Sequence, residues 1–322
     1  MTIKNDTPKR VFLLTLLLLF ILPSTLLANG AFSSYETKNA TYKQVNSFFK
    51  MPDYMYANPH TGITLPDGAS PATIPTIFFT FEVTEPYAIM DIGLMFLDGG
   101  WKVEYLAKGA TAVRSDEPWK VWSALSGNQS ITIGTPAASL NTGKSGTVLN
   151  HQANQLLQMN AYITDLTKGP GLRYEVYNES GTLLVRSDVP ITTTVANKVK
   201  NEGASWTREF AMASNLPTNQ YIADGSYAWN AQFQKGWVIG TNGTWYPWND
   251  TYAKPLAKKI EEFGTSIPSQ YANKISVYSA NNPISPYKDD YVNINYNSSN
   301  LHLLSPLSSI QVEQPVQSKA IK

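Results

Sequence analysis

Three carboxylates stand in segments of alternating polarity, where two of them could act as an acid–base pair. Asp91 lies in the middle of YAIMDIGLMFL, while Glu82 and Glu104 lie in TIFFTFEVT and WKVEYL. Glycosidases need only two carboxylates at a fixed separation. The alternation predicts that all three side chains point outward from one sheet, opposite its apolar face. The solvent face of an antiparallel sheet ordinarily carries such residues, so we expect a surface and keep a secreted hydrolase as the weakest hypothesis.

No catalytic or metal-binding motif accompanies these carboxylates. The chain has no cysteine, and its three histidines, His60, His151 and His302, lie far apart. A thiolate nucleophile and a cysteine zinc site are therefore excluded, and no P-loop, G-x-S-x-G or H-E-x-x-H pattern occurs. Asp116-Glu117 and Asp289-Asp290 offer hard oxygen ligands but lack the spaced Asp/Asn/Gly loop of a calcium site. We expect a non-enzymatic protein without a metal or a cofactor.

The densest group of aromatic residues is GWVIGTNGTWYPWND, residues 236–250. Asn242-Gly243 is the strongest short signal for a two-residue type I′ hairpin turn. The resulting register pairs Trp237 with Trp248 and places Trp245 alone on the opposite side. Three rings then share one face, the candidate ligand-binding site: Trp237, Tyr246 and Trp248. If this face is exposed, the rings can stack on sugars; if it points inward, they belong to the core, as most strand aromatics do.

Short alternating segments separated by Gly, Asn and Asp turns predict strands through the middle of the chain. We expect strands at 76–84, 87–97, 101–106, 119–125, 130–135 and 157–163, and a second set after the TKGPGL break at 167–172. The pattern predicts an all-β fold with two immunoglobulin-like or jelly-roll-like antiparallel β-sandwich domains, 76–168 and 169–268. An irregular N-terminal arm, 29–75, and a polar, partly disordered C-terminal tail, 269–322, flank them. Short helices are expected only near 42–49 and 257–263.

The first 28 residues have the layout of a secretory signal peptide, with Lys4, Lys9 and Arg10 before an apolar run that Pro23 ends. We expect cleavage after Ala28 and export to the medium, the cell surface or the periplasm; an uncleaved membrane anchor is the alternative. Loss of this segment leaves 22 basic and 23 acidic side chains. A near-neutral surface does not attract nucleic acid, so we expect no such partner and a membrane contact only through the signal segment.

Residues 172–248 contain a hairpin with Gly181 and Val185 in its returning strand, followed by Asp224-Gly225 and Tyr227. This segment resembles bacterial immunoglobulin-like modules of the kind found in flagellar hook-capping and secreted surface proteins. The resemblance implies an immunoglobulin-like fold and a structural or assembly role, and it carries over no catalytic residue. The rest of the chain resembles no family that we can name.

These observations leave three functional hypotheses. The first is an exported, non-catalytic surface protein with a structural, adhesive or filament-subunit role. It would self-assemble or bind other surface proteins when its N-terminal arm adds a strand to an open sheet edge. The second is a carbohydrate-binding protein that uses surface rings, since the chain has eight tryptophans and 18 tyrosines. The third is the secreted hydrolase.

Overall fold

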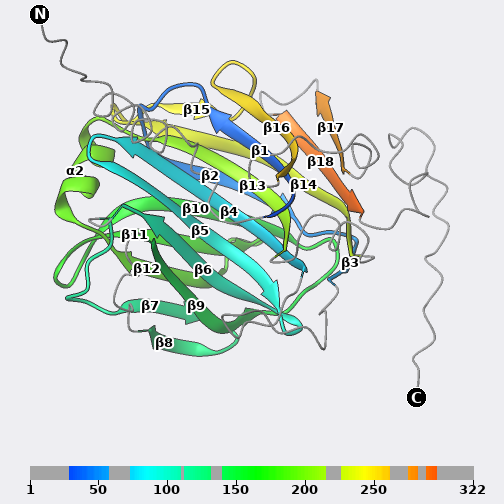
Figure 1. Cartoon of the computed structure of the whole chain (residues 1–322), viewed down its shortest axis with the longest axis horizontal. Coiled ribbons are helices and arrows are strands. Elements are labelled where there is room, and N and C mark those ends of the chain that lie inside the picture. The colour runs from blue at the N-terminus through cyan, green and yellow to red at the C-terminus, as the bar shows by residue number, and fades with distance from the viewer. Residues whose placement is uncertain are drawn as a thin grey trace, which may run out of the picture.

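Two antiparallel β-sheets lie face to face in the computed structural model (Figure 1). The structure describes residues 29–57, 73–109, 112–131, 140–214, 226–261, 275–281 and 288–295. Almost every element in these ranges is a strand. The predicted all-β sandwich is confirmed.

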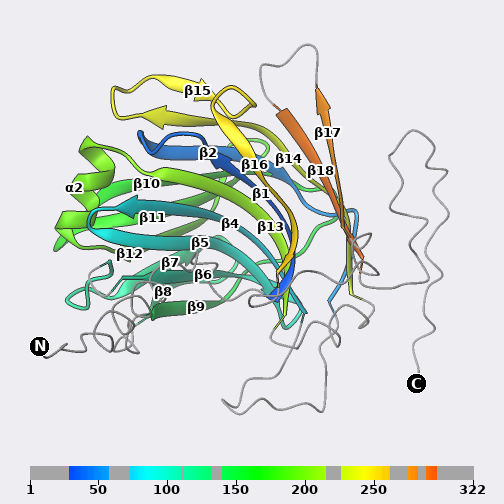
Figure 2. The ribbon, with the colours of Figure 1, turned by 45° about the horizontal axis from the view of Figure 1, so that its top comes forward.

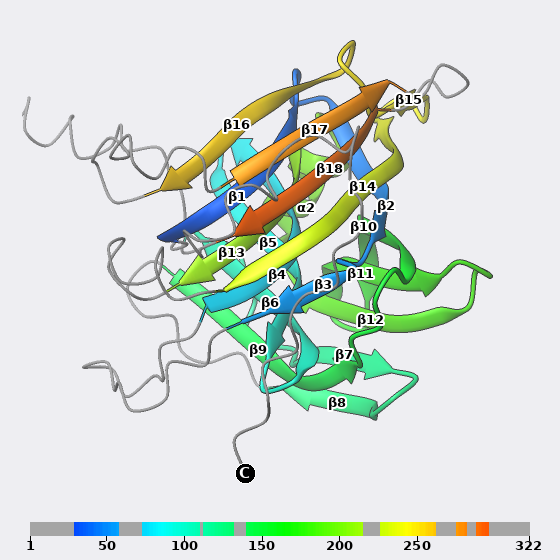
Figure 3. The same ribbon diagram turned by 90° about the vertical axis from the view of Figure 1, so that its right-hand side faces the viewer.

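The smaller sheet has seven strands and the larger has eleven. The order in the smaller sheet is β16 (Ala253–Glu261), β1 (Asn29–Thr37), β13 (Ser205–Ser214), β4 (Thr73–Thr84), β5 (Tyr87–Leu97), β6 (Gly100–Lys108) and β9 (Leu140–Leu149). The order in the larger sheet is β17 (Ile275–Asn281), β18 (Lys288–Asn295), β14 (Tyr227–Gly240), β2 (Tyr42–Lys50), β10 (Leu156–Leu166), β11 (Gly169–Asn178), β12 (Leu183–Pro190), β7 (Trp119–Ser123) and β8 (Gly127–Ile131). The short strands β3 (Tyr54–Tyr56) and β15 (Trp245–Pro247) both pair with β14 (Figure 3).

The core lies between the sheets and is filled by the inward side chains of both. Aromatic rings bridge the two layers. Phe79 of β4 contacts Tyr174 of β11, with ring centroids 6.4 Å apart, and Tyr105 of β6 meets Trp119 of β7 at 4.9 Å. The alternation read from the sequence of β4, β5 and β6 is therefore the alternation between this core and the outer face of the smaller sheet.

The segment predicted as an irregular arm forms β1, β2 and β3 where the structure describes it. The helix expected near 42–49 is wrong, because these residues form β2. The inward side chains of β2 include Tyr42, Val45 and Phe49, a spacing of three and four positions that is typical of a helix. A bulge causes this spacing: Tyr42 pairs with Gly240 and Gln44 with Ile239, so one residue of β2 is left over.

The helix α2 (Thr193–Asn201) lies at one end of the sandwich (Figure 2), where the sequence suggested a strand. Its buried face consists of Val195, Ala196 and Val199. Gly203 follows it with a φ of +97°, a conformation that commonly ends helices. The apolar spacing and this glycine are the helix signals that the preceding run of threonines obscured.

Two further segments differ from expectation. The helix expected at 257–263 is wrong, since β16 extends to Glu261 and pairs with β1. No strand was expected between 135 and 157, yet β9 lies there. Gly143 is required there: a Cβ at this position would lie 2.4 Å from Tyr105 Cε1 and 2.7 Å from the Trp119 ring. β17 and β18 lie within the segment predicted as a polar, partly disordered tail, 269–322.

The predicted domain boundary at 168 and 169 falls inside the β10–β11 hairpin, which pairs continuously from Leu157 with Asn178 to Leu166 with Gly169. β13 pairs with β4, and β12 pairs with β7. Strands from the two predicted domains therefore lie side by side in both sheets. The signal segment, 1–28, lies outside the described residues. Within the described ranges, no helix has the length and apolarity needed to cross a membrane.

Candidate ligand-binding face

The aromatic hairpin has a register one residue away from the predicted one. Trp237 faces Pro247, where the prediction placed Trp248, and Ile239 faces Trp245. Successive strand residues point to opposite faces. Trp237 and Trp245 therefore share the outer face of the larger sheet, and the predicted common face of Trp237, Tyr246 and Trp248 is wrong.

The turn explains this shift. A type I′ turn needs a positive φ at both central residues, but of Asn242 and Gly243 only Gly243 has one, +83°. Asn242 Oδ1 instead accepts a hydrogen bond from the Thr244 N–H (2.9 Å), and the Gly243 N–H donates to the Gly240 carbonyl (2.9 Å). The result is a type I turn followed by a left-handed glycine, which makes the loop one residue longer.

Two of the three predicted site residues lie on the inner side. Trp248 is fully buried, and its ring lies 5.2 Å from the Arg208 guanidinium carbon. Tyr246 is half-buried and packs edge-on against Tyr42, with centroids 5.8 Å apart. The rings of Trp248 and Tyr246 therefore pack against residues inside the protein, whereas Trp237 lies on the outer face of the larger sheet.

Three rings on the outer face form what we call the first platform: Phe48, Trp237 and Trp245. The rings of Trp237 and Trp245 lie 5.3 Å apart, and those of Phe48 and Trp237 lie 6.1 Å apart. Trp245 is 59% exposed, the largest exposed fraction among the bulky apolar residues that the structure describes. The predicted register put Trp245 alone on the opposite side of the hairpin, and Phe48 was predicted to lie in a helix. Neither residue was therefore predicted as part of the candidate site.

A row of polar side chains continues from Trp237 across the larger sheet. The residues facing one another in register are Trp237, Asn46, Asn160, Glu175, Arg186 and Trp122. Asn46 donates through Nδ2 to Asn160 Oδ1. Primary amides can donate and accept at the same time. The row thus places a buried amide, Asn46, directly beside the first platform and a half-buried one, Asn160, on the next strand.

The charged groups on this face are paired with one another. Arg186 Nε donates to Glu175 Oε1 (2.8 Å), and the Tyr177 hydroxyl donates to Glu175 Oε2 (2.8 Å). Burial, together with the hydrogen bond to Glu175, raises the pKa of Tyr177 to about 12, so this phenol keeps its proton at neutral pH. Arg173 binds Asp188 with two hydrogen bonds, of 2.7 and 2.9 Å. The charges that β11 and β12 place on this face are therefore paired with one another.

The outward position predicted for Glu82, Asp91 and Glu104 is confirmed. They lie on β4, β5 and β6, which are neighbours in the smaller sheet, and the Thr80 hydroxyl donates to Asp91 Oδ1 (2.6 Å). Burial raises the pKa of Asp91 to about 7. Burial also raises the pKa of Glu104 to about 7, against the attraction of Lys144 and with added repulsion from Asp91. These two carboxyls hold protons near neutral pH because this face is covered: Ile89 and Met95, on the same side of β5 as Asp91, are buried. Hydrolysis stays a prediction.

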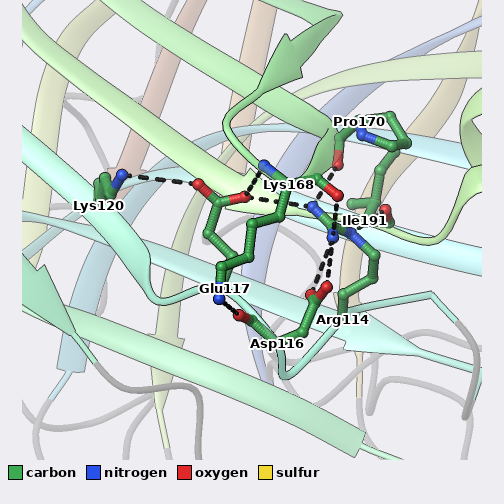
Figure 4. Close-up of polar contacts among 7 residues, drawn as sticks. All are labelled: Arg114, Asp116, Glu117, Lys120, Lys168, Pro170 and Ile191. Carbon is green, nitrogen blue, oxygen red and sulfur yellow. Dashed lines mark hydrogen bonds and ion pairs between the residues drawn. The ribbon is translucent and has the colours of Figure 1, made fainter.

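Asp116 and Glu117, considered as calcium ligands, belong to an ionic clamp around Arg114 (Figure 4). Arg114 Nη1 donates to both Asp116 carboxylate oxygens (2.8 and 2.9 Å), and Nη2 lies 3.4 Å from Glu117 Oε2. Glu117 Oε2 also accepts from the Lys168 N–H (3.1 Å), and Arg114 Nε donates to the Ile191 carbonyl (2.9 Å). The clamp joins three separate segments of the chain, and its groups are engaged with one another.

His151 has a structural position. It is half-buried beside Phe96 and accepts at Nδ1 from Trp101 Nε1 (3.4 Å), and burial lowers its pKa. His60 and His302 lie outside the described residues. Asp289 and Asp290 lie in β18. Among the residues that the structure describes, no group of three or more His, Cys, Asp or Glu side chains could hold a metal ion.

No protein-family model matches this chain, and no curated protein matches its sequence. The immunoglobulin-like resemblance therefore remains a prediction. Of the residues that carry it, Gly181 and Val185 lie in the β11–β12 hairpin and Tyr227 begins β14. Asp224 and Gly225 lie outside the described residues.

Proposed function

We propose that this protein is a non-catalytic carbohydrate-binding β-sandwich protein and that it binds glycans on the outer face of its larger sheet. The first platform of Phe48, Trp237 and Trp245 supplies apolar ring faces, and the half-buried amide of Asn160 nearby supplies hydrogen bonds. A sugar ring has an apolar face and a rim of hydroxyls, so this combination matches both of its surfaces.

One observation carries this proposal: the 59% exposed Trp245 packs against Trp237, with the ring planes 40° apart, next to Asn46 and Asn160. A large ring exposed to water on a sheet face adds little to the stability of the core. It becomes useful when a ligand covers it, because that burial removes apolar area from water. Neutral polar partners beside the rings favour a ligand with hydroxyl groups over a purely apolar one.

An exported, adhesive surface protein is a setting in which such a face would act, and export itself stays a prediction. The filament-subunit hypothesis had relied on an N-terminal arm outside the sheets. Residues 29–37 and 42–50 instead lie within the sheets, so strand addition would need another segment as the donor. The carbohydrate hypothesis, second in order from the sequence, is therefore the one that the geometry favours.

Affinity electrophoresis of the protein in gels containing neutral polysaccharides, such as cellulose derivatives, xylan, mannan and β-1,3-glucan, tests the proposal. We expect retardation by at least one of them, and we expect Trp245→Ala to reduce it about tenfold or more, because one stacked ring contributes on the order of 1–2 kcal/mol.

Tyr87→Ala is the matched control, since Tyr87 is 43% exposed but belongs to β5 of the smaller sheet. It should leave retardation unchanged. Wild-type protein that runs freely through every gel would refute the proposed function, as would equal retardation of wild type and Trp245→Ala.

A further inference from the structure

A second group of exposed rings lies on the same outer face, at the other end of β14. Tyr54 and Tyr56 of β3 face Trp229 and Tyr227 of β14, so all four side chains point to one side. Tyr54 is 40% exposed and Tyr56 is 45% exposed, and the rings of Tyr56 and Tyr227 lie 6.1 Å apart. We call this group, Tyr54, Tyr56, Tyr227 and Trp229, the second platform.

A ladder of amide side chains on β14 connects the two platforms. Gln234 Nε2 donates to Gln232 Oε1 (3.1 Å), and Gln232 Nε2 donates to Asn230 Oδ1 (2.9 Å). Asn230 Nδ2 in turn donates to Asp53 Oδ2 (2.7 Å). Each primary amide has two N–H donors and one carbonyl acceptor, so the ladder fixes the orientation of these groups. Gln232 is buried, whereas the half-buried Asn230 and Gln234 keep capacity for ligand hydroxyls.

The spacing of the platforms suits a long ligand. Eight positions separate Trp229 from Trp237, which at the usual rise of a strand corresponds to roughly 25 Å, somewhat less where β14 bulges. A single sugar ring cannot touch both ends. Figure 3 shows β14 running the length of this face, next to β2 and β3 on one side and β18 on the other.

The charges on this face indicate what kind of polysaccharide fits the site. The amides of the ladder are neutral, and the carboxylate at its end, Asp53, is paired with Lys50 (3.2 Å). Farther along the sheet, Arg173 and Arg186 are held by Asp188 and Glu175. With Arg173 and Arg186 already paired, the exposed Lys235 of β14 is a cation left for an anionic polymer, and the comparison with polygalacturonate measures its effect.

We propose that the first platform, the amide ladder and the second platform form one extended site along β14 for a linear, uncharged polysaccharide. This inference rests on the proposed function and adds the length and charge of the ligand. Two platforms on one polymer chain act as linked sites, so affinity rises with chain length. A disaccharide should occupy the first platform alone.

Isothermal titration of the full chain tests this inference. The probes are a disaccharide and a hexasaccharide of the neutral polysaccharide that retards the wild type best, and polygalacturonate serves as the anionic polymer. We expect the hexasaccharide to bind at least tenfold more tightly than the disaccharide. Tyr56→Ala should weaken hexasaccharide binding about five- to tenfold and change disaccharide binding less than twofold.

Tyr54→Ala, on the same exposed platform, is a second variant in case Tyr56→Ala folds poorly, and Tyr87→Ala should change neither affinity. If the wild type binds glycans but neither Tyr54→Ala nor Tyr56→Ala weakens hexasaccharide binding, the extended site is wrong. The first platform would then remain the proposed binding site. Preferential binding of polygalacturonate overturns the inferred ligand class. Absence of all glycan binding refutes the proposed function as well.

Discussion

Trp245 and Trp248 lie three positions apart in one hairpin segment and have opposite environments, so they separate binding from stability at the scale of single residues. Trp248 is fully buried against Arg208, whereas Trp245 is 59% exposed. We expect Trp248→Ala to lower the free energy of unfolding by about 3–5 kcal/mol, since it leaves a large cavity in the core. Trp245→Ala should change it by less than about 0.5 kcal/mol. Urea denaturation measures both; a similar loss in the two variants would contradict this division of roles.

Residue chemistry also predicts how stability depends on pH. The pKa of Asp91 is raised to about 7 in the folded protein by burial, so folding favours the protonated carboxyl. The stabilisation is complete below the unfolded pKa of about 4 and is lost as the pH rises through about 7. Asp91→Asn should therefore make the protein more stable than wild type at pH 8, by about 1–3 kcal/mol, and not at pH 4.

Thermal or urea unfolding at several pH values from 4 to 8 measures this effect. Asp98→Asn is a suitable control, because Asp98 lies in the β5–β6 turn with its side chain 73% exposed. The pH profile of Asp98→Asn should follow that of the wild type. Parallel profiles for wild type and Asp91→Asn would show that the Asp91 carboxyl does not cause the pH dependence of stability. Glu104, whose pKa is also raised to about 7, would then be the next residue to replace.

At the scale of elements, the ionic clamp fixes three connections that the sheets alone do not hold. Arg114 reaches Asp116 and Glu117 in its own loop, the β10–β11 turn and Ile191 ahead of α2. Glu117 is only 3% exposed, so removal of the guanidinium leaves a buried carboxylate with less compensation. We expect Arg114→Ala to cost about 3–5 kcal/mol of stability, measured by urea denaturation.

A double-mutant cycle distinguishes the ion pair from simple loss of packing. If the pair matters, Glu117→Gln should cost less in the Arg114→Ala background than in the wild type, with a coupling energy of about 1–3 kcal/mol. Purely additive effects would contradict the clamp as an energetic unit.

Elements were predictable from the sequence where one face is apolar without interruption. β4 and β6 alternate because one side meets the core and the other holds Glu82 and Glu104. In β5, Ile89 and Met95 on the side of Asp91 are buried as well. The prediction failed where a backbone irregularity changes the period, as with the bulge in β2. It failed again in the aromatic hairpin, because the Asn242 side chain bonds the Thr244 N–H and selects a different turn. That one residue decided which rings form the candidate site.

At the scale of the whole molecule, sequence patterns show which face of a strand is apolar but not which strand lies beside it. Nothing in the alternation of β4 indicates that its partner is β13, whose residues begin at Ser205. The first platform has the same origin, since Phe48 and Trp237 come from distant parts of the chain and meet only because β2 pairs with β14. The break at 167–172, after which a second set of strands was expected, contains the tight turn of the β10–β11 hairpin and the first residues of β11.

This strand order predicts the folding behaviour of fragments. Residues 76–168 contain β10 without its partners β2 and β11, and β7 without its partner β12. They also contain most of β4 without β13. β4 and β7 therefore lose the backbone hydrogen bonds on one side and β10 loses them on both sides, and much of the core is missing. We therefore expect the isolated fragment to be unfolded or aggregated.

Far-UV circular dichroism and urea titration of this fragment, compared with residues 29–322, test the expectation. The longer chain should unfold in a single transition that tryptophan fluorescence and circular dichroism report alike. A fragment with its own cooperative transition would instead show that the boundary at 168 separates two folding units, and that the pairing of β13 with β4 adds little to the stability of either.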